Sequence, residues 1–517
     1  MQCIDPITLK HWLHGKEELA VLDVREHGQY GESHLFLATS LPYSRLQYDI
    51  SRLVPRKSSK IVLYDDDGHG VCLRAAQALE KMGYSNLYVL EGGTQSWAKA
   101  GFTLFAGVNL PSKTFGELIE HHFKTPRITA PELMKKMESS EDLLILDGRP
   151  QSEFKKMSIP GAQCCPNGEL SYRIQSLAPN PNTTIVINCA GRTRSIIGAQ
   201  TLINLGIPNP VFALENGTQG WFLQDFALDH GKSGPYAEPL VNAPLLDKVT
   251  QLAKRFSIPL ISDAQFNAWA AEKDRSLYLC DVRTAEEFKA QSLAGAQHTP
   301  GGQLIQATDQ FIGTRNARIV LYDSDGTRAI TVASWLKQMG HEVAVLKDGL
   351  QSTVSLPNIE RPDINALRLL TDAQLVSVAT QGDALLLDLR ASMQYRKAHL
   401  AQAIWSIRPK LLGAVQDPKK PIICIVEDLA IAYGALAELA TIDLTPLFYL
   451  VKNNAFPAGL ELASTPDQPA DSECIDYLFF VHDRHDGNKE AARRYLEWET
   501  GLLAQLDQQE RELFKLT

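Results

Sequence analysis

The stretch "TIVINCAGRTRSIIGAQTL", from Thr184 to Leu202, is predicted to form a buried strand, a short loop and a helix. Apolar β-branched residues come first, and an alanine-containing helical pattern follows the loop. The loop, "CAGRTRS" at 189–195, carries one cysteine, one glycine and two arginines. A strand, a loop and a helix in this order are typical of a parallel sheet whose strands are connected through helices.

Related stretches occur four times along the chain. An apolar run ending in Asp-x-Arg appears as "VLDVR", "LILDGR", "LYLCDVR" and "LLLDLR", with the aspartate at Asp23, Asp147, Asp281 and Asp388. A second apolar run follows each, and 42 residues separate Asp23 from Asp65, Asp147 from Cys189, and Asp281 from Asp323. The repeated interval makes Cys189, Asp65 and Asp323 equivalent positions, and Glu427 is an approximate match in the fourth copy.

This repetition predicts the α/β class, with four tandem units that each form a parallel sheet flanked by helices. We place the units at residues 1–107, 125–235, 255–358 and 364–465. A C-terminal segment at 470–517 has apolar residues at helical spacing, and we expect one or two amphipathic helices docked against a neighbouring unit. Its "VHDRHDG" stretch, 481–487, fits a turn and helix start better than a metal site, because the spacing matches no standard ligand pattern.

The composition argues against several classes of protein. The chain has 517 residues, 44% of them hydrophobic, and a net charge of −9 without any Lys/Arg-rich run, so we expect no nucleic-acid partner. No apolar run approaches the roughly 20 residues that span a bilayer, and the first residues lack the apolar core of a signal peptide. Eight scattered cysteines form neither a disulfide framework nor a metal-ligand pattern. We therefore expect a cytoplasmic protein without a bound metal or a membrane partner.

The cysteine loop has the features of an anion-binding site with a nucleophile inside it. A short loop between a strand and a helix directs its backbone N–H groups toward a common centre at the helix N-terminus. A cysteine in that positive field is expected to have a lowered pKa and to exist largely as thiolate. Arg192 and Arg194 add two positive charges beside Cys189. The loop thus predicts an activated nucleophile that meets an anionic substrate.

At this point the sequence resembles the rhodanese family of sulfurtransferases. The resemblance rests on "CAGRTRS" after a strand, Asp-Gly-Arg 42 residues upstream, "IPGA" between them and "ENGTQGW" downstream. It covers all four units, and it implies that Cys189 is the nucleophile that carries a persulfide. It further implies that Asp147 and Arg149 support the loop and that Arg192 and Arg194 hold the donor. The amides that would surround the sulfur belong to Ala190, Gly191, Arg192, Thr193, Arg194 and Ser195.

The resemblance also implies the partners of the reaction. The sulfur donor would be a small anion, thiosulfate or a related persulfide, and the acceptor would be cyanide or a thiol, with a protein acceptor as a further option; no cofactor is needed. Arg194 stands five positions after Cys189, whereas related phosphatases have a loop one residue longer, which disfavours phosphatase activity. The loop also departs from the "CGSGVT"-like pattern of mercaptopyruvate enzymes.

The other three units are predicted to be inactive, because a carboxylate cannot form a persulfide. Asp65 is followed by two more aspartates, which repel an anionic donor. In the third unit, Asp323 and Arg328 are expected to neutralise each other and keep an empty loop in shape. The fourth unit has lost both the glycine and the arginine.

Two alternatives remain open from the sequence. The chain could be a non-enzymatic scaffold of tandem rhodanese units in which Cys189 senses sulfide or redox state. Cys164 or Cys165, which precede the loop in the same unit, could act as a resolving thiol, although ordinary packing is the simpler interpretation.

Overall fold

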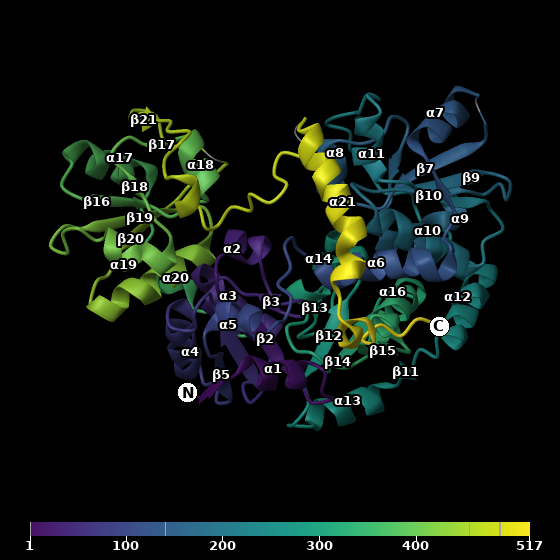
Figure 1. Ribbon diagram of the computed structural model, residues 1–517, viewed down its shortest axis with the longest axis horizontal. Helices are drawn as coiled ribbons and strands as arrows, with labels where there is room; N and C mark the ends of the chain where they lie inside the picture. The colour runs from purple at the N-terminus through teal and green to yellow at the C-terminus, as the bar shows by residue number, and fades with distance from the viewer. Residues whose placement is uncertain (1, 140, 454, 485–486) are drawn as a thin grey trace. The chain divides into compact units, whose positions relative to one another are not determined.

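The computed structural model describes residues 2–139, 141–453, 455–484 and 487–517 (Figure 1). It contains two compact units. One comprises Met1–Leu13, Leu19–Val108 and Ile359–Phe480, and the other comprises His14–Glu18, Asn109–Asn358 and Val481–Thr517. The first and fourth repeats therefore belong to one unit. The second and third repeats share the other unit with the C-terminal segment.

Each repeat is built on a parallel sheet, as predicted. The first three repeats have the same five-stranded order: β1-β5-β4-β2-β3, β6-β10-β9-β7-β8 and β11-β15-β14-β12-β13. The fourth repeat keeps the four-stranded order β18-β16-β19-β20, and a separate antiparallel pair joins β17 to β21.

The strands are short, and in each repeat the strand that precedes the loop lies inside the sheet. The strands of the first two repeats are β1 (Gln2–Ile4), β2 (Ala20–Asp23), β3 (Thr39–Ser40), β4 (Ile61–Tyr64), β5 (Leu87–Leu90), β6 (Arg127–Ile128), β7 (Leu143–Asp147), β8 (Gln163–Cys164), β9 (Thr184–Asn188) and β10 (Val211–Leu214). Those of the last two are β11 (Leu260–Ile261), β12 (Leu277–Asp281), β13 (Gln297–His298), β14 (Arg318–Tyr322), β15 (Glu342–Leu346), β16 (Leu385–Asp388), β17 (His399–Leu400), β18 (Ile404–Trp405), β19 (Ile422–Val426), β20 (Leu447–Leu450) and β21 (Leu462–Ala463).

Helices connect the strands of each sheet. Those of the first two repeats are α1 (Pro6–Leu13), α2 (His27–Glu32), α3 (Leu46–Leu53), α4 (Val71–Lys81), α5 (Gly93–Lys99), α7 (Ala130–Glu138), α8 (Gln151–Lys156), α9 (Leu170–Leu177), α10 (Thr193–Leu205) and α11 (Gly217–Leu223). Those of the last two are α13 (Asp263–Ala271), α14 (Ala285–Ala290), α15 (Gly301–Gln306), α16 (Thr327–Gln338), α17 (Asp372–Gln381), α18 (Ser392–Lys397), α19 (Leu411–Ala414) and α20 (Leu429–Leu439).

Two further helices fill stretches that the predicted domain boundaries leave unassigned. They are α6 (Leu110–Phe123), before the second repeat, and α12 (Ala243–Arg255), before the third. Both belong to the unit that holds the second and third repeats. The proposed boundaries of the four repeats themselves stay predictions.

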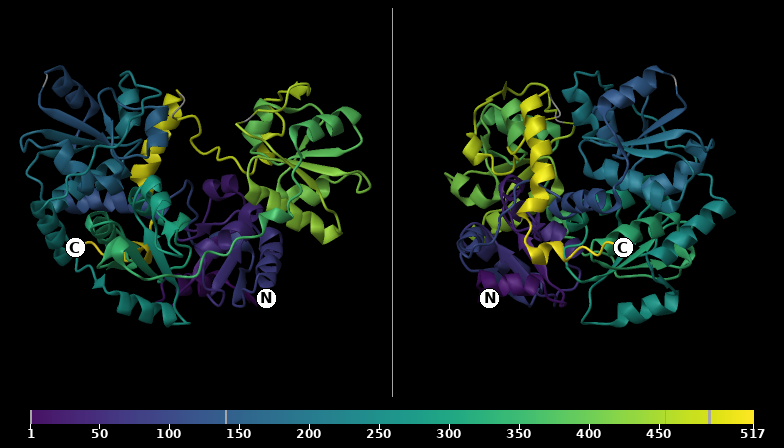
Figure 2. Two further views of the ribbon diagram at one scale, coloured as in Figure 1. Left: turned by 180° about the vertical axis from the view of Figure 1, so that it is seen from behind. Right: turned by 45° about the vertical axis from the view of Figure 1, so that its right-hand side comes forward.

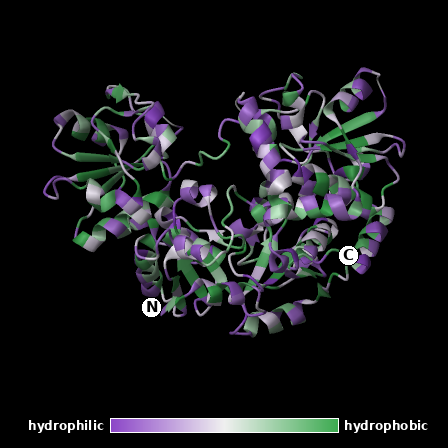
Figure 3. Ribbon diagram, in the orientation of Figure 1, coloured by the Kyte–Doolittle hydropathy of each residue, from purple (hydrophilic) through white to green (hydrophobic). Residues whose placement is uncertain are grey.

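The strand before the cysteine loop shows why helices lie on both faces of the sheet. Ile185 and Ile187 of β9 pack into one buried cluster, and Val186 between them packs into another. Alternate side chains of a strand point to opposite faces, so both faces of this sheet are covered by apolar groups. Figure 3 shows the strands as mostly hydrophobic.

The C-terminal segment forms α21 (Lys489–Gln505) and α22 (Gln508–Arg511). Helix α21 packs against α6 and α11, as the yellow helix in Figures 1 and 2 illustrates. His485 and Asp486 of the "VHDRHDG" stretch lie outside the described residues. Among the described residues, no helix is both long enough and apolar enough to cross a bilayer.

A buried ion pair recurs in all four repeats. In each Asp-x-Arg motif the arginine Nη2 contacts the aspartate Oδ2 and also donates to the carbonyl eight residues further on. The aspartate–arginine distances are 2.6 Å for Asp23–Arg25, 2.7 Å for Asp147–Arg149, 2.6 Å for Asp281–Arg283 and 2.6 Å for Asp388–Arg390. The carbonyls belong to Ser33, Met157, Gln291 and Ala398. The motif therefore ties the end of one strand to the segment after the next helix.

Removing one partner of this pair should destabilise a repeat strongly. We expect Asp281→Ala to lower the free energy of unfolding by about 3–5 kcal/mol, because it leaves the buried Arg283 guanidinium without its carboxylate. The double variant Asp281→Ala/Arg283→Met should lose less. Urea denaturation followed by circular dichroism measures both, and equal losses in the single and double variants would contradict the assigned role of the pair.

Candidate active site

The cysteine loop lies at the carboxyl edge of the second sheet. Strand β9 ends at Asn188, and Cys189 follows it directly. Asn188 pairs with Asp147 in the register of β9 with β7, and its side-chain Nδ2 donates to Asp147 Oδ2 at 2.9 Å. Since Asp147 also holds Arg149, the pair lies beneath the start of the loop. The structure thus brings Asp147 and Arg149 next to the loop, where the sequence placed them.

The sulfur of Cys189 lies at the N-terminus of α10, which begins at Thr193. Ser195 Oγ donates to Cys189 Sγ at 3.1 Å, and the Ser195 backbone N–H also favours the ionised sulfur. The Cys189 side chain is only 2% exposed. Of the residues that the sequence assigned to the cradle, Ser195 therefore contacts the thiol directly.

The N-terminus of α11 holds the cysteine loop through hydrogen bonds to its carbonyl groups. Thr218 N donates to Cys189 O at 2.8 Å, and Gln219 N donates to Ala190 O at 3.1 Å. Gly217 has φ +53°, and a Cβ there would lie 2.3 Å from Cys189 O, so only glycine fits. The sequence offered "ENGTQGW" as a family landmark, but nothing in it indicated this supporting contact.

Arg192 does not point into the cradle. Its guanidinium pairs with Glu117, through Nε at 2.7 Å and Nη2 at 2.9 Å, and also with Glu120. Both glutamates belong to α6, which the sequence left outside the predicted domains. The structure therefore does not bring the Arg192 side chain to the position that the predicted donor-binding role requires.

Arg194 is paired as well, but it stays close to the sulfur. Its Nη1 and Nη2 each contact one oxygen of Glu153, both at 2.8 Å. Asn167 Nδ2 donates to Arg194 O at 2.8 Å and fixes the backbone at this point. Arg194 lowers the pKa of Cys189 through its charge, so it acts on the thiol in the predicted direction.

The net shift of the Cys189 pKa is opposite to the prediction. Burial raises the pKa of the Cys189 thiol, and this effect outweighs Arg194 and the two hydrogen-bond donors of Ser195. Glu499 of α21 raises the pKa further. The sequence-based expectation of a thiolate was therefore wrong for this arrangement. It could not include a glutamate that comes 310 residues after the cysteine.

In the loops of the first and third repeats, an aspartate carboxylate stands at the position that the Cys189 thiol has in the second. In the third repeat, Asp323 accepts hydrogen bonds from the backbone N–H groups of Gly326, Arg328 and Ala329. The Arg328 side chain lies 3.8 Å from Asp323 Oδ2, in agreement with the expected neutralisation. Arg328 also pairs with Glu287 and Glu169. The carboxylate of Asp323 thus fills its own loop, whereas the sequence analysis predicted an empty one.

The first repeat follows the same principle. Asp65 Oδ1 accepts from Gly68 N at 2.7 Å, and Asp65 Oδ2 accepts from Cys72 N at 3.0 Å. Asp66 is neutralised by Arg25, at 2.7 Å. In the fourth repeat Glu427 instead accepts from Ala391 N at 3.1 Å, outside any cradle.

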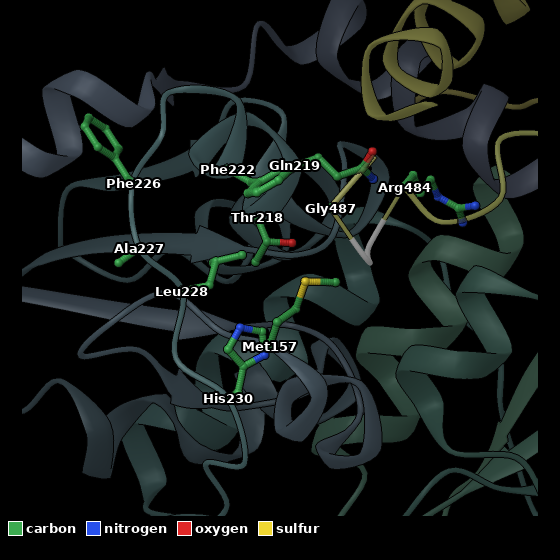
Figure 4. Close-up of a pocket in the computed structure, with 10 residues that line it drawn as sticks. All are labelled: Met157, Thr218, Gln219, Phe222, Phe226, Ala227, Leu228, His230, Arg484 and Gly487. Atoms are coloured by element: carbon green, nitrogen blue, oxygen red, sulfur yellow. The ribbon is translucent and has the colours of Figure 1, made fainter. Parts of the chain in front are cut away.

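A pocket borders α11 of the second repeat. Its volume is about 470 Å³, and Thr218 and Gln219 belong to its wall. Figure 4 shows Phe226 and Arg484 at opposite ends of this pocket. The complete lining is Met157, Thr218, Gln219, Phe222, Phe226, Ala227, Leu228, His230, Arg484 and Gly487.

The other cysteines of the second repeat are poorly suited to react. Burial raises the pKa of Cys164 to about 12, and its Sγ lies 3.4 Å from the Arg149 carbonyl, to which it donates. Cys165 is fully buried, and its pKa is raised well above the usual value. These positions favour packing over a resolving role.

Comparison with known proteins agrees with the fold and the loop. The family of the rhodanese-like domain matches residues 5–100, 129–224 and 263–355. The chain belongs to this family, and it is an enzyme of the rhodanese type, a sulfurtransferase. The fourth repeat falls outside these matches, but its sheet repeats the strand order of the others without the outer strand.

Individual relatives support this assignment. The crystal structure of a thiosulfate sulfurtransferase from Pseudomonas aeruginosa is 36% identical and has a TM-score of 0.89, with 100% of this chain and 99% of that chain covered. The putative sulfur carrier protein YrkF of Bacillus subtilis (strain 168) is 29% identical over 139 residues, which are 25% of this chain and 71% of YrkF. The uncharacterized protein YibN of Escherichia coli (strain K12) is 27% identical over 93 residues, 18% of this chain and 64% of its own length.

The effect of Glu499 on the thiol can be tested directly. We expect Glu499→Gln to lower the pKa of Cys189, because it removes a nearby negative charge but keeps an acceptor for Thr193. The pH profile of Cys189 alkylation by iodoacetamide should shift to lower pH. Glu497→Gln, on the exposed side of the same helix, is the control. Faster alkylation at every pH without a shift would show altered access instead, and would contradict the charge effect.

Proposed function

We propose that this chain transfers a sulfane sulfur from thiosulfate or a related persulfide donor to cyanide or a thiol, through a persulfide on Cys189. One observation carries the proposal. Equivalent loops of the same fold hold a carboxylate against their own backbone N–H groups, and only the second repeat offers a thiol there. A protein thiol is a further candidate for the acceptor.

The first half-reaction begins with the Cys189 thiolate, formed when its proton passes to a base in solvent. The sulfur attacks the outer sulfur of thiosulfate and forms a new S–S bond. The bond between the two sulfurs of thiosulfate breaks, and its electron pair leaves with sulfite. In the second half-reaction a thiolate or cyanide attacks the outer sulfur of the persulfide, and Cys189 leaves as thiolate.

The surrounding residues have separate roles in this proposal. The backbone N–H groups of 190–195 surround the transferred sulfur, and Ser195 Oγ stabilises the Cys189 thiolate each time it forms. Arg194 opposes the unfavourable effect of burial on the charged sulfur. Asp147 and Arg149 support the loop, and we reassign Arg192 to tying the loop to α6.

The remaining parts of the chain fit around this reaction. The pocket of about 470 Å³ beside Thr218 and Gln219 is large enough for a small thiol acceptor. All eight cysteines are free, which suits a reducing compartment, and we propose the cytoplasm. We retain four rhodanese-like domains at 1–107, 125–235, 255–358 and 364–465, of which the second is catalytic.

Intact-mass spectrometry tests the proposal. Thiosulfate or glutathione persulfide should add about 32 Da, one sulfur atom, to the wild-type chain. Cyanide should remove it, and Cys189→Ser should not acquire it. No adduct from either donor would contradict the proposal and leave a binding scaffold as the function.

The third repeat offers a test of the loop chemistry. In a Cys189→Ser background, we expect Asp323→Cys/Ala329→Ser to gain a removable adduct of about 32 Da. The two changes supply the thiol and a hydroxyl at the offset of Ser195, and Arg328 stands at the offset of Arg194. Asp65→Cys in the same background should gain none, since Gly70 occupies the arginine position. Equal loading of both loops would show that the arginine is dispensable.

A further inference from the structure

Helix α6 places three residues of one face against the cysteine loop. Gly116 packs so closely on Thr193 that a Cβ there would lie 2.9 Å from Thr193 Cγ2. Glu117 binds Arg192, as described above. Lys113 lies one helical turn before Gly116, on the same face of α6. This lysine has no counterpart in the loop motif and was not singled out by the sequence.

Lys113 is unusually enclosed for a lysine. Its side chain is 6% exposed, and Nζ donates to the hydroxyl of Tyr495 at 2.6 Å. The same Nζ lies 4.5 Å from the centre of the Tyr495 ring and 4.6 Å from that of Trp498. Within the described part of the chain, Lys113 forms no direct ion pair with a carboxylate. Buried lysines are normally paired, so this ammonium group retains capacity to bind an anion.

Tyr495 connects Lys113 to the loop that holds the sulfur. A Cβ at Gly191 would lie 3.0 Å from Tyr495 Cε1, so the ring rests on the loop itself. The hydroxyl of the same side chain reaches Lys113. The Tyr495 side chain therefore contacts the ammonium group through its hydroxyl and the loop through its ring. Helix α21 fixes it there.

The two loop arginines are less available to a donor. Arg192 is occupied by Glu117 and Glu120, and Arg194 is held by Glu153 through both terminal nitrogens. Glu499 is close enough to act on Lys113 through its charge, but its Oε1 accepts from Thr193 Oγ1 at 2.8 Å. Among the described residues, Lys113 is thus a cation beside this loop that no carboxylate holds directly.

We propose that Lys113 is a donor-binding residue, which receives the negatively charged end of an anionic sulfane donor such as thiosulfate while its outer sulfur meets Cys189. The assignment rests on the proposed function and names the substrate class that this site selects. Tyr495, from the C-terminal helix, is a positioning residue that holds the ammonium group beside the loop. The C-terminal segment is therefore part of the donor site.

The charge of Lys113 changes within an accessible pH range. Burial lowers the pKa of Lys113 to about 8, in spite of the favourable charge of Glu499. The other groups facing it are Tyr495, Arg484, Arg194 and Cys189; the two arginines lower its pKa, and Cys189 raises it. The ammonium form is complete below this pKa and is lost as the pH rises through it.

The experiment compares a charged donor with an uncharged one. Rates of Cys189 persulfide formation are measured by mass spectrometry with thiosulfate and with diallyl trisulfide. With the trisulfide, Cys189 attacks the central sulfur and releases allyl thiolate, which then attacks the remaining allyl-bound sulfur and leaves the Cys189 persulfide and diallyl disulfide. We expect Lys113→Met to slow loading from thiosulfate by about 10- to 100-fold, as for a lost hydrogen bond to a charged group, and to leave loading from the trisulfide unchanged. Lys113→Arg should retain most of the preference for thiosulfate. Lys135→Met, at an exposed lysine of α7, should behave as wild type.

The ratio of the two rates provides the second readout. In the wild type, the preference for thiosulfate should fall as the pH rises through about 8, and in Lys113→Met it should not depend on pH. Taking the ratio cancels the ionisation of Cys189 itself. An equal loss with both donors would assign Lys113 to the fold and overturn the proposal, as would a variant with unchanged preference. Failure of the wild type to load from either donor would overturn the proposed function instead.

Discussion

Backbone N–H groups at the start of the helix after a central strand need a partner, and this requirement shapes each repeat. In the first and third repeats the carboxylates of Asp65 and Asp323 accept hydrogen bonds from their own loops. In the second repeat, Cys189 occupies the equivalent position, and its sulfur accepts from Ser195. A carboxylate fills the loop with an internal acceptor, whereas a thiol leaves the loop able to stabilise the negative sulfur that sulfur transfer requires. The residue at this position therefore decides whether the loop is filled by its own carboxylate, and in the second repeat Arg194 and Ser195 accompany the thiol.

Burial of Cys189 disfavours the thiolate that the proposed reaction needs. The Cys189 thiol is enclosed, and its desolvation raises its pKa in spite of Arg194 and Ser195. Enclosure strengthens the same electrostatic interactions once an anion is present, because the local dielectric constant is low. The loop is thus better suited to stabilising the charge that develops during transfer than to maintaining a thiolate at rest. Glu499 and Lys113, one on each neighbouring helix, adjust this balance in opposite directions.

Apolar runs that alternate with helical patterns predicted the parallel sheets, and the repeated interval of 42 residues predicted the equivalence of Cys189 with Asp65 and Asp323. The resemblance to the rhodanese family implied the position of Asp147 beneath the loop. Periodicity and spacing are local properties, so the sequence shows them directly. The partners of Arg192 could not be predicted in this way, because Glu117 lies 75 residues earlier in a helix outside the repeat. The raised pKa of Cys189 was missed for the same reason. It depends on enclosure by the folded chain and on Glu499, and neither leaves a pattern in the loop sequence.

The C-terminal helix gives the second repeat what the other three lack. The four repeats share the strand order and the Asp-x-Arg pair, so neither feature distinguishes the second repeat from the others. Helix α21 contacts the second repeat through Thr193, Gly191 and the neighbouring helix α6. A loop that contains a carboxylate does not need an added cation, because its backbone N–H groups already have an acceptor. A loop that must admit an external anion does need such a cation. The segment that holds Lys113 beside the loop belongs to the same compact unit as Cys189. The duplicated fold supplies the cradle, and the additions outside the repeat determine which anion it receives.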